Sequence, residues 1–145
     1  MILGVEFSMN KPLEEWIKFY EKKTGEKFVR DESYELFYLP DKGFCELAVG
    51  DKMIVIKQLS GDARFWKKFA EEIARQMQKK VCGTWFIRRE VKAYIRLLGF
   101  KVERVETLPD GLERYYGVDK NGKKGLMSPA YKNGKQKEYF VTWEV

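Results

Sequence analysis

The 145-residue sequence has no histidine, only two cysteines and no apolar run long enough to cross a membrane. The absence of histidine excludes Ser-His-Asp and Cys-His catalysis and removes a common ligand of zinc and haem, so no metal is expected. A membrane-spanning helix needs about 18 or more consecutive apolar residues. The opening residues, MILGVEFSMN, also lack the basic flank and cleavage site of a signal peptide. We therefore expect a soluble, cytoplasmic protein.

The two cysteines lie in apolar, strand-like contexts, GFCELAV for Cys45 and VCGTWF for Cys82. Free cysteine behaves as a small buried hydrophobe, and thiols stay reduced in the cytoplasm. We predict that both are reduced core residues. Hydrophobic residues make up 44% of the chain, which is enough for one ordinary core, and no repeat or linker interrupts it. The simplest organisation is a single domain over residues 1–145.

The positive charge is unevenly distributed along the chain. The formal net charge is +6, and residues 61–100 alone carry ten basic and four acidic residues. Residues 1–60 carry nine basic and eleven acidic residues, and residues 101–145 carry nine basic and seven acidic ones. We therefore expect an anionic partner at the middle segment, either a phosphate-bearing cofactor or nucleic acid.

Hydrophobic periodicity in the first part of the chain predicts a strand, a helix and a meander. A strand over residues 1–8 precedes a helix that Asn10 caps, that accepts Pro12 in its first turn and that ends at Gly25. The short turns PDKG and GDK then join three strands into an antiparallel meander. These predicted strands span residues 33–39, 44–50 and 53–59.

The second part of the chain alternates helices and strands before a tail that is rich in turn signals. Apolar residues recur at i, i+4 and i+8 over residues 63–77, which predicts a helix packed on a sheet. The Asn-Gly pairs at 121–122 and 133–134 predict C-terminal hairpins. Between them we expect a strand over 80–87, a helix over 88–99 that ends at Gly99, and a strand over 101–108. This order predicts an α+β fold with a mixed, mostly antiparallel central sheet flanked by helices.

The stretch QLSGDARFWKKF passes from a predicted strand into a predicted helix through one glycine. Backbone N–H groups at a helix start attract anions, and Gly61 lets a ligand approach the backbone without a Cβ in the way. Arg64, Lys67 and Lys68 follow at the positive end of the helix, where cations are normally disfavoured. Two interpretations are open: an anion binds at the helix start, or these basic side chains extend into solvent.

Asp62 weighs against an anion at this position. A carboxylate about 6 Å from a phosphate costs on the order of 1 to 3 kcal/mol at an effective dielectric constant near 20. An aspartate in this place is also a good N-cap, which satisfies the same N–H groups that a phosphate would use.

The element order and two local motifs resemble the GNAT superfamily of N-acetyltransferases, which transfer an acetyl group from acetyl-CoA to an amine. The first motif is the family's pyrophosphate loop (Gln or Arg, two residues, Gly, one residue, Gly or Ala), which is QLSGDA here. The second is a helix end with a Gly-Phe pair, which is AYIRLLGFKV here, with Gly99 and Phe100. The resemblance covers residues 50–106, and on either side it rests on element order alone.

The resemblance implies a GNAT-like domain with an acetyl-CoA site where the third meander strand meets the helix. The pantetheine is expected along Met53 to Lys57, and the pyrophosphate at Leu59 to Ala63. The implied cofactor-binding residues are Ile56, Gln58, Leu59, Ser60, Gly61, Asp62, Ala63 and Arg64.

The catalytic residues depart from the family's pattern. The tyrosine that protonates the departing thiolate stands four residues before the glycine of the Gly-Phe pair, where this chain has Ile95. Tyr94 is the candidate acid, but it lies about 100° round the helix and acts only if the helix register differs; the alternative is a tyrosine that packs or faces solvent. Glu46 is the candidate base, acting through water on an ammonium group. Alternation places it opposite to Cys45 and Leu47, so the alternative is a solvent-exposed carboxylate.

Two functions are therefore open. The first is a divergent acyl-CoA-dependent N-acetyltransferase with an amine acceptor that the sequence does not name. The second is a GNAT-like binding protein without activity that contacts nucleic acid or a protein through basic surface. Residues 120–137 carry six lysines and no acid, which suits a phosphate backbone, although lysines also keep hairpin edges soluble. Small size and high lysine content suggest a bacterial or phage-encoded chain, present as a monomer or a homodimer.

Overall fold

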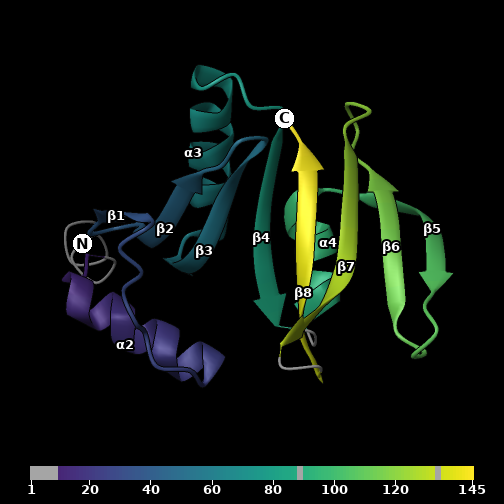
Figure 1. The fold of residues 1–145 in the computed structure, drawn as a ribbon. Coiled ribbons are helices and arrows are strands. Elements are labelled where there is room, and N and C mark those ends of the chain that lie inside the picture. The colour runs from purple at the N-terminus through teal and green to yellow at the C-terminus, as the bar shows by residue number, and fades with distance from the viewer. Residues whose placement is uncertain (1–9, 88–89, 133–134) are drawn as a thin grey trace, which may run out of the picture.

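The computed structural model describes residues 10–87, 90–132 and 135–145, which form one eight-stranded sheet with helices on its faces (Figure 1). The strand order is β1-β2-β3-β4-β8-β7-β6-β5. Only β3 and β4 are parallel, and every other neighbouring pair is antiparallel. The elements are α2 (Leu13–Thr24), β1 (Glu35–Leu39), β2 (Gly43–Val49), β3 (Met53–Gly61), α3 (Ala63–Gln76), β4 (Val81–Ile87), α4 (Val91–Leu98), β5 (Lys101–Thr107), β6 (Glu113–Val118), β7 (Lys124–Lys132) and β8 (Lys135–Glu144).

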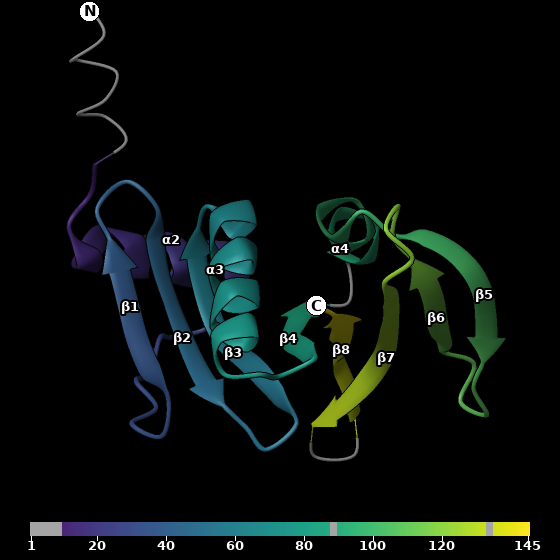
Figure 2. The same ribbon diagram turned by 90° about the horizontal axis from the view of Figure 1, so that it is seen from above.

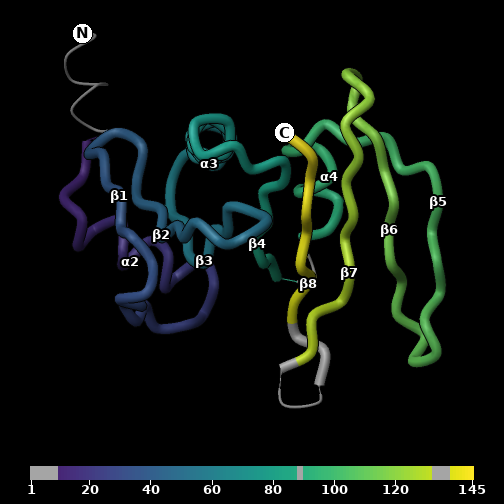
Figure 3. The backbone as a smooth tube through the Cα atoms, turned by 45° about the horizontal axis from the view of Figure 1, so that its top comes forward, coloured from purple at the N-terminus to yellow at the C-terminus, as the bar shows by residue number. Residues whose placement is uncertain are grey.

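The predicted α+β plan with a mixed, mostly antiparallel sheet is confirmed. The helices and strands follow in the predicted order, and β6, β7 and β8 form the expected C-terminal hairpins. Figure 3 shows β5 to β8 running side by side as one half of the sheet. The predicted strand over 1–8, residues 88–89 of the predicted helix and the Asn-Gly pair at 133–134 lie outside the described residues.

The helix ends follow the predicted glycines but not the predicted cap. Gly25 and Gly99 both adopt left-handed conformations, with φ of 75° and 69°, and so end α2 and α4. The prediction that Asn10 caps the first helix is wrong. The N-cap of α2 is Pro12, whose ring lacks an N–H and fixes a conformation suited to a helix start, and no side chain caps this end.

The helices α2 and α3 lie on opposite faces of the β2–β3 half of the sheet (Figure 2). On the α3 face, Trp66 and Ala70 belong to the same buried core as Ile54 and Ile56. On the α2 face, the Tyr20 ring lies 5.8 Å from that of Phe44. Helix α4 instead covers the β4–β8 half, where the Tyr94 ring stacks on Phe86 of β4, which in turn stacks on Tyr139 of β8. The two predicted core cysteines are confirmed as buried, free thiols.

The parallel strands β3 and β4 pair over a short stretch and then separate. Their register runs from Met53 opposite Val81 to Ile56 opposite Thr84. Beyond that point β3 continues along β2, whereas β4 continues along β8. The pairing of β3 with β2 changes register at the same place. Gln58 pairs with Glu46 and Ile56 pairs with Leu47, so Lys57 has no partner residue in β2. Lys57 is therefore the extra residue of a β-bulge, which bends β3 away from β4.

Candidate functional site

The separation of β3 and β4 opens a cavity of about 440 Å³ between them. Its walls come from both strands and from α2, α3 and α4, so it passes through the sheet rather than lying on one face. A volume of this size is in the range of small-molecule sites, roughly 300 to 1,000 Å³. The lining includes Tyr20, Lys23 and Glu26 from α2 and the segment after it, Lys67 from α3, Trp85 and Phe86 from β4, Ala93 and Tyr94 from α4, and Glu138 and Trp143 from β8.

The edge of β3 that faces the cavity carries backbone groups without a partner strand. Successive residues of a strand direct their N–H and C=O groups to opposite sides, so only about half of those in 57–61 can pair with β2. The side chain of Thr84 donates to the carbonyl oxygen of Ile56 at 2.9 Å and so satisfies the last group before the strands part. The remaining groups on this edge can bind an extended ligand that carries amides of its own.

Both Tyr94 and Ile95 pack against the hydrophobic core, but only Tyr94 of the two belongs to the described lining of the cavity. The ring of Tyr94 stacks on Phe86, with centroids 4.1 Å apart. Burial, and secondarily the charge of Glu90, raises the pKa of the Tyr94 hydroxyl well above its usual range. The phenol therefore stays protonated at neutral pH, as a proton donor must. The register of α4 is thus the one that presents Tyr94, rather than Ile95, to the cavity.

Tyr20 of α2 approaches the cavity from the other face of the sheet. Burial first, and then the nearby carboxylates of Glu26 and Glu138, raise its pKa to about 12. Both glutamates also line the cavity. The lining residues from α2, the segment after it and β8 therefore combine a neutral phenol with two acidic groups, Glu26 and Glu138, and one basic group, Lys23. Acidic groups outnumber basic ones in this part of the lining, which favours a cationic ligand over an anionic one.

The strand predicted over 53–59 is longer than expected, because β3 runs through Gly61 and only Asp62 separates it from α3. The residues that the resemblance gave to a pyrophosphate loop, 58–63, therefore form no separate loop. Gln58, Leu59 and Ser60 are paired residues of that strand, opposite Glu46, Cys45 and Phe44. The predicted cofactor-binding residues nevertheless divide in a simple way. Those that line the cavity are Ile56, Gln58, Leu59, Ser60, Gly61 and Ala63, whereas Asp62 and Arg64 lie on a shallow surface depression with Lys42 and Lys68.

Gly61 is needed for the packing of two backbone segments. Its φ is 101°, and a Cβ at this position would lie 2.2 Å from the carbonyl oxygen of Lys42. Gly43 faces it across the β2–β3 pair, and a Cβ there would lie 1.9 Å from the carbonyl oxygen of Ser60. This close approach gives the glycine in QLSGDA a structural cause that requires no ligand.

Asp62 caps α3, which agrees with the capping interpretation. Its carboxylate accepts from the backbone N–H of Phe65 at 3.0 Å and lies 3.5 Å from the Lys42 ammonium. Lys67, one of the basic residues in the first turns, pairs with Glu71 at 2.9 Å. These carboxylates partly compensate the unfavourable positive charge at the start of the helix, and they do so without a bound anion.

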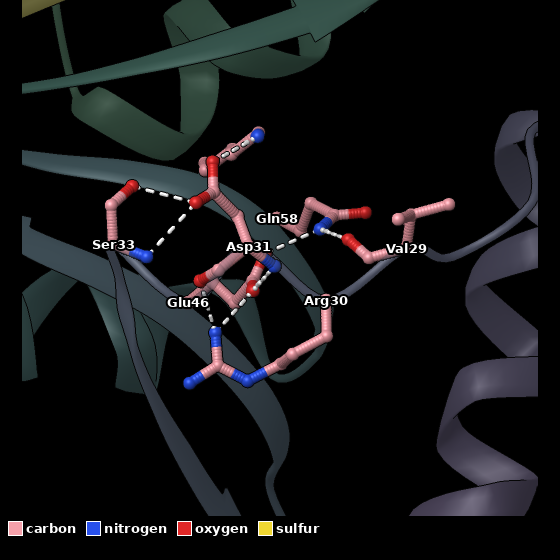
Figure 4. Close-up of polar contacts among 7 residues, drawn as sticks. Val29, Arg30, Asp31, Ser33, Glu46 and Gln58 are labelled. Carbon is pink, nitrogen blue, oxygen red and sulfur yellow. Dashed lines mark hydrogen bonds and ion pairs between the residues drawn. The ribbon is translucent and has the colours of Figure 1, made fainter.

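Glu46 lies elsewhere than predicted. It is fully buried on the α2 face of β2, so the prediction of a solvent-exposed carboxylate is wrong. Figure 4 shows its oxygens accepting hydrogen bonds from Arg30, from the backbone N–H of Asp31 and from Gln58. Among the described residues it does not line the cavity. Its role as a base stays a prediction, while the contacts favour an anchoring role.

Several cavity residues gave no signal in the sequence. Tyr20 falls within the first predicted helix and Trp85 within the strand predicted over 80–87, and neither was predicted as a site residue. Glu138 reaches the cavity because β8 inserts beside β4, a pairing between strands that lie far apart in the chain. Glu138 could have been assigned to the cavity if this strand order had been known. The residues next to it in the sequence give no such indication.

Three lysines of the C-terminal hairpins, Lys120, Lys123 and Lys124, are not part of the described lining of the cavity. Lys120, Lys123 and Lys124 are exposed around the turn between β6 and β7. The described residues contain no group of three or more candidate metal ligands. No helix in the described ranges is both long and apolar enough to span a bilayer.

Comparison with known proteins gives structural likeness only. No family model and no curated protein matches the chain. One similar structure is a GNAT family acetyltransferase from Elizabethkingia anophelis with acetyl-CoA bound; it is 16% identical, the match covers 94% of this chain and 86% of that one, and the TM-score is 0.42. Another is an acetyltransferase from Bacillus subtilis in complex with CoA, with 11% identity, coverage of 94% and 93%, and a TM-score of 0.43. These likenesses assign no family to the chain and no role to any of its residues.

Proposed function

We propose that the protein is an acyl-CoA-dependent N-acetyltransferase whose acetyl-CoA site is the cavity between β3 and β4. The observation that carries the proposal is the separation of these parallel strands after Ile56 and Thr84, which leaves an open backbone edge beside a cavity. Pantetheine is an extended chain with two amides, so it suits an open strand edge. When bound, acetyl-CoA supplies an activated thioester.

The residues around the cavity supply the remaining requirements of the reaction. Tyr94, held protonated by its raised pKa, donates a proton to the departing sulfur. An amine enters as the ammonium ion from the α2 side, where Glu26 and Glu138 favour its positive charge. One of these carboxylates takes a proton from it, directly or through water, and the free amine nitrogen then forms a bond to the thioester carbon as the C–S bond breaks. Backbone N–H groups of β3 near the bulge polarise the thioester carbonyl. Most of the rate enhancement then comes from holding amine and thioester together.

The phosphates are expected at the α3 end of the cavity. Ala63 and Lys67 line that end, and Arg64 and Lys68 lie close by on the surface. Because Asp62 takes up the N–H of Phe65, the phosphates rely on these cations and on the N–H groups of the first helical residues. This arrangement predicts weaker binding than an uncapped helix start would give.

Acetyl transfer is tested by release of free CoA thiol in the presence of single amines. We expect release with small cationic amines, and slower release with amines that carry a carboxylate, because Glu26 and Glu138 repel it. The acetylated amine is identified by mass spectrometry in the same reaction. Retention of intact acetyl-CoA with every amine tested would instead favour the GNAT-like binding protein without activity.

A further inference from the structure

The buried carboxylate of Glu46 joins two segments that are distant in the sequence. Taking a carboxylate out of water is costly unless several donors compensate it. Here the donors are Arg30 Nη1 at 2.6 Å, the backbone N–H of Asp31 at 2.8 Å and Gln58 Nε2. Arg30 and Asp31 belong to the connection between α2 and β1, whereas Gln58 belongs to β3 (Figure 4). Glu46 is therefore an anchor shared by the connection and the strand.

Two further contacts join the same two segments directly. The ammonium group of Lys57 pairs with the carboxylate of Asp31, and Gln58 Nε2 donates to the carbonyl oxygen of Val29 at 3.0 Å. Ser33 donates to the same Asp31 carboxylate through both its backbone and its hydroxyl. Val29 and Asp31 are thus bonded directly to Gln58 and Lys57, and Arg30 between them is linked to Gln58 through Glu46.

The strand end of this network is the place where β3 leaves β4. Lys57 is the bulge residue, and the pairing of β3 with β4 ends at Ile56, one residue earlier. Lys57 and Gln58 both line the cavity, as does Glu26 near the start of the connection. Because a bulge is locally unpaired, its conformation depends on side-chain contacts of this kind. The width of the opening therefore depends on what holds Lys57 and Gln58.

We propose that Glu46 is a positioning residue that couples the α2–β1 connection to the bulge of β3 and so holds the cavity open for its ligand. The carboxylate itself touches no ligand. The network fixes both the strand edge on one side of the cavity and the connection that carries Glu26 on the other. This inference rests on the proposed function only for the choice of acetyl-CoA as the probe.

The test is Glu46→Gln, which keeps the size of the side chain but replaces an acceptor oxygen with a donor. Amide hydrogen exchange, read by mass spectrometry, is expected to speed up about tenfold or more in 29–31 and, together with it, in 57–61. The acetyl-CoA dissociation constant is expected to rise about tenfold at a temperature where the variant is fully folded. The matched control is Glu72→Gln on the exposed face of α3, which should change neither quantity.

The two readouts separate the possible failures. Faster exchange confined to 29–31, with 57–61 and acetyl-CoA affinity unchanged, would show that Glu46 only anchors the connection, and the proposal would be wrong. If acetyl-CoA does not bind the wild-type protein, coupled exchange still supports the positioning role while the proposed function fails. If Glu46→Gln does not fold, Asp31→Asn replaces it. That variant weakens the Lys57 link and keeps the hydrogen bonds to Glu46, so exchange in the two segments should rise together but less.

Discussion

Replacing Tyr94 with phenylalanine is expected to lower kcat for acetyl transfer by about a hundredfold or more, with acetyl-CoA affinity unchanged. The substitution keeps the ring that stacks on Phe86 and removes only the hydroxyl of this cavity-lining residue. Without this proton donor the thiolate must leave unprotonated or take its proton from water. The rate of CoA release gives kcat, and calorimetry gives the affinity for acetyl-CoA. Together they distinguish a loss of rate from a loss of binding.

The pH dependence of kcat gives a second reading of the same residue. A proton donor must be protonated, so its activity is lost as the pH rises through its pKa. Burial raises the pKa of Tyr94 above about 10, the ordinary value for tyrosine. We therefore expect no decrease in kcat as the pH is raised to about 10.

The matched control for Tyr94→Phe is Tyr38→Phe. Tyr38 belongs to β1, donates to the carbonyl oxygen of Lys11 at 2.6 Å and does not line the cavity among the described residues. Its loss should change kcat by less than about twofold, because it removes one distant hydrogen bond. Equal kcat values for the two variants would remove Tyr94 from the mechanism.

Replacing Gly61 with alanine is expected to lower the free energy of unfolding by about 2 to 4 kcal/mol. The position has a φ of 101°, and the new Cβ would lie 2.2 Å from the Lys42 carbonyl oxygen and 2.9 Å from the Cα of Gly43. Both contacts are with backbone, so no side-chain rotation relieves them. Urea unfolding followed by circular dichroism measures the change.

Gly25→Ala is the control for backbone conformation alone. Gly25 is also left-handed, with a φ of 75°, but no atom lies within 4 Å of a Cβ built there. Its replacement should cost about 1 kcal/mol. The difference between the two variants measures the contact between Gly61 and the Lys42–Gly43 turn. Equal losses would show that this contact is not what requires glycine at position 61.

The sequence predicted the elements well because their signals are local. The apolar spacing over 63–77 and the glycines at 25 and 99 are readable without knowledge of the partners. The end of β3 was not readable in this way. Gln58, Ser60 and Gly61 have the composition of a loop, and their pairing with β2 becomes visible only once Gly43 is known to lie opposite Gly61.

Part of the lining of the candidate cavity could be predicted from the sequence, and the rest could not because it depends on tertiary contacts. Most of the predicted cofactor residues do line the cavity, since the strand-to-helix junction is one of its walls. The burial of Glu46 could not be predicted, because its donors Arg30 and Gln58 lie 16 and 12 residues away. Likewise, the choice between Tyr94 and Ile95 depends on the face by which α4 packs on Phe86, which helical spacing alone does not fix.

Binding of acetyl-CoA in the cavity between β3 and β4 is tested most directly by a thermal-shift titration of three proteins. Ala93 is an exposed residue of α4 that lines the cavity, so Ala93→Trp should obstruct the site without disturbing the core. Lys92→Trp makes the same substitution at an exposed neighbour that is not part of the described lining. At a hundred times its dissociation constant, acetyl-CoA should stabilise the wild-type protein and Lys92→Trp by about 2.7 kcal/mol, and Ala93→Trp much less. No stabilisation of the wild-type protein, or equal stabilisation of all three, would contradict an acetyl-CoA site between these strands.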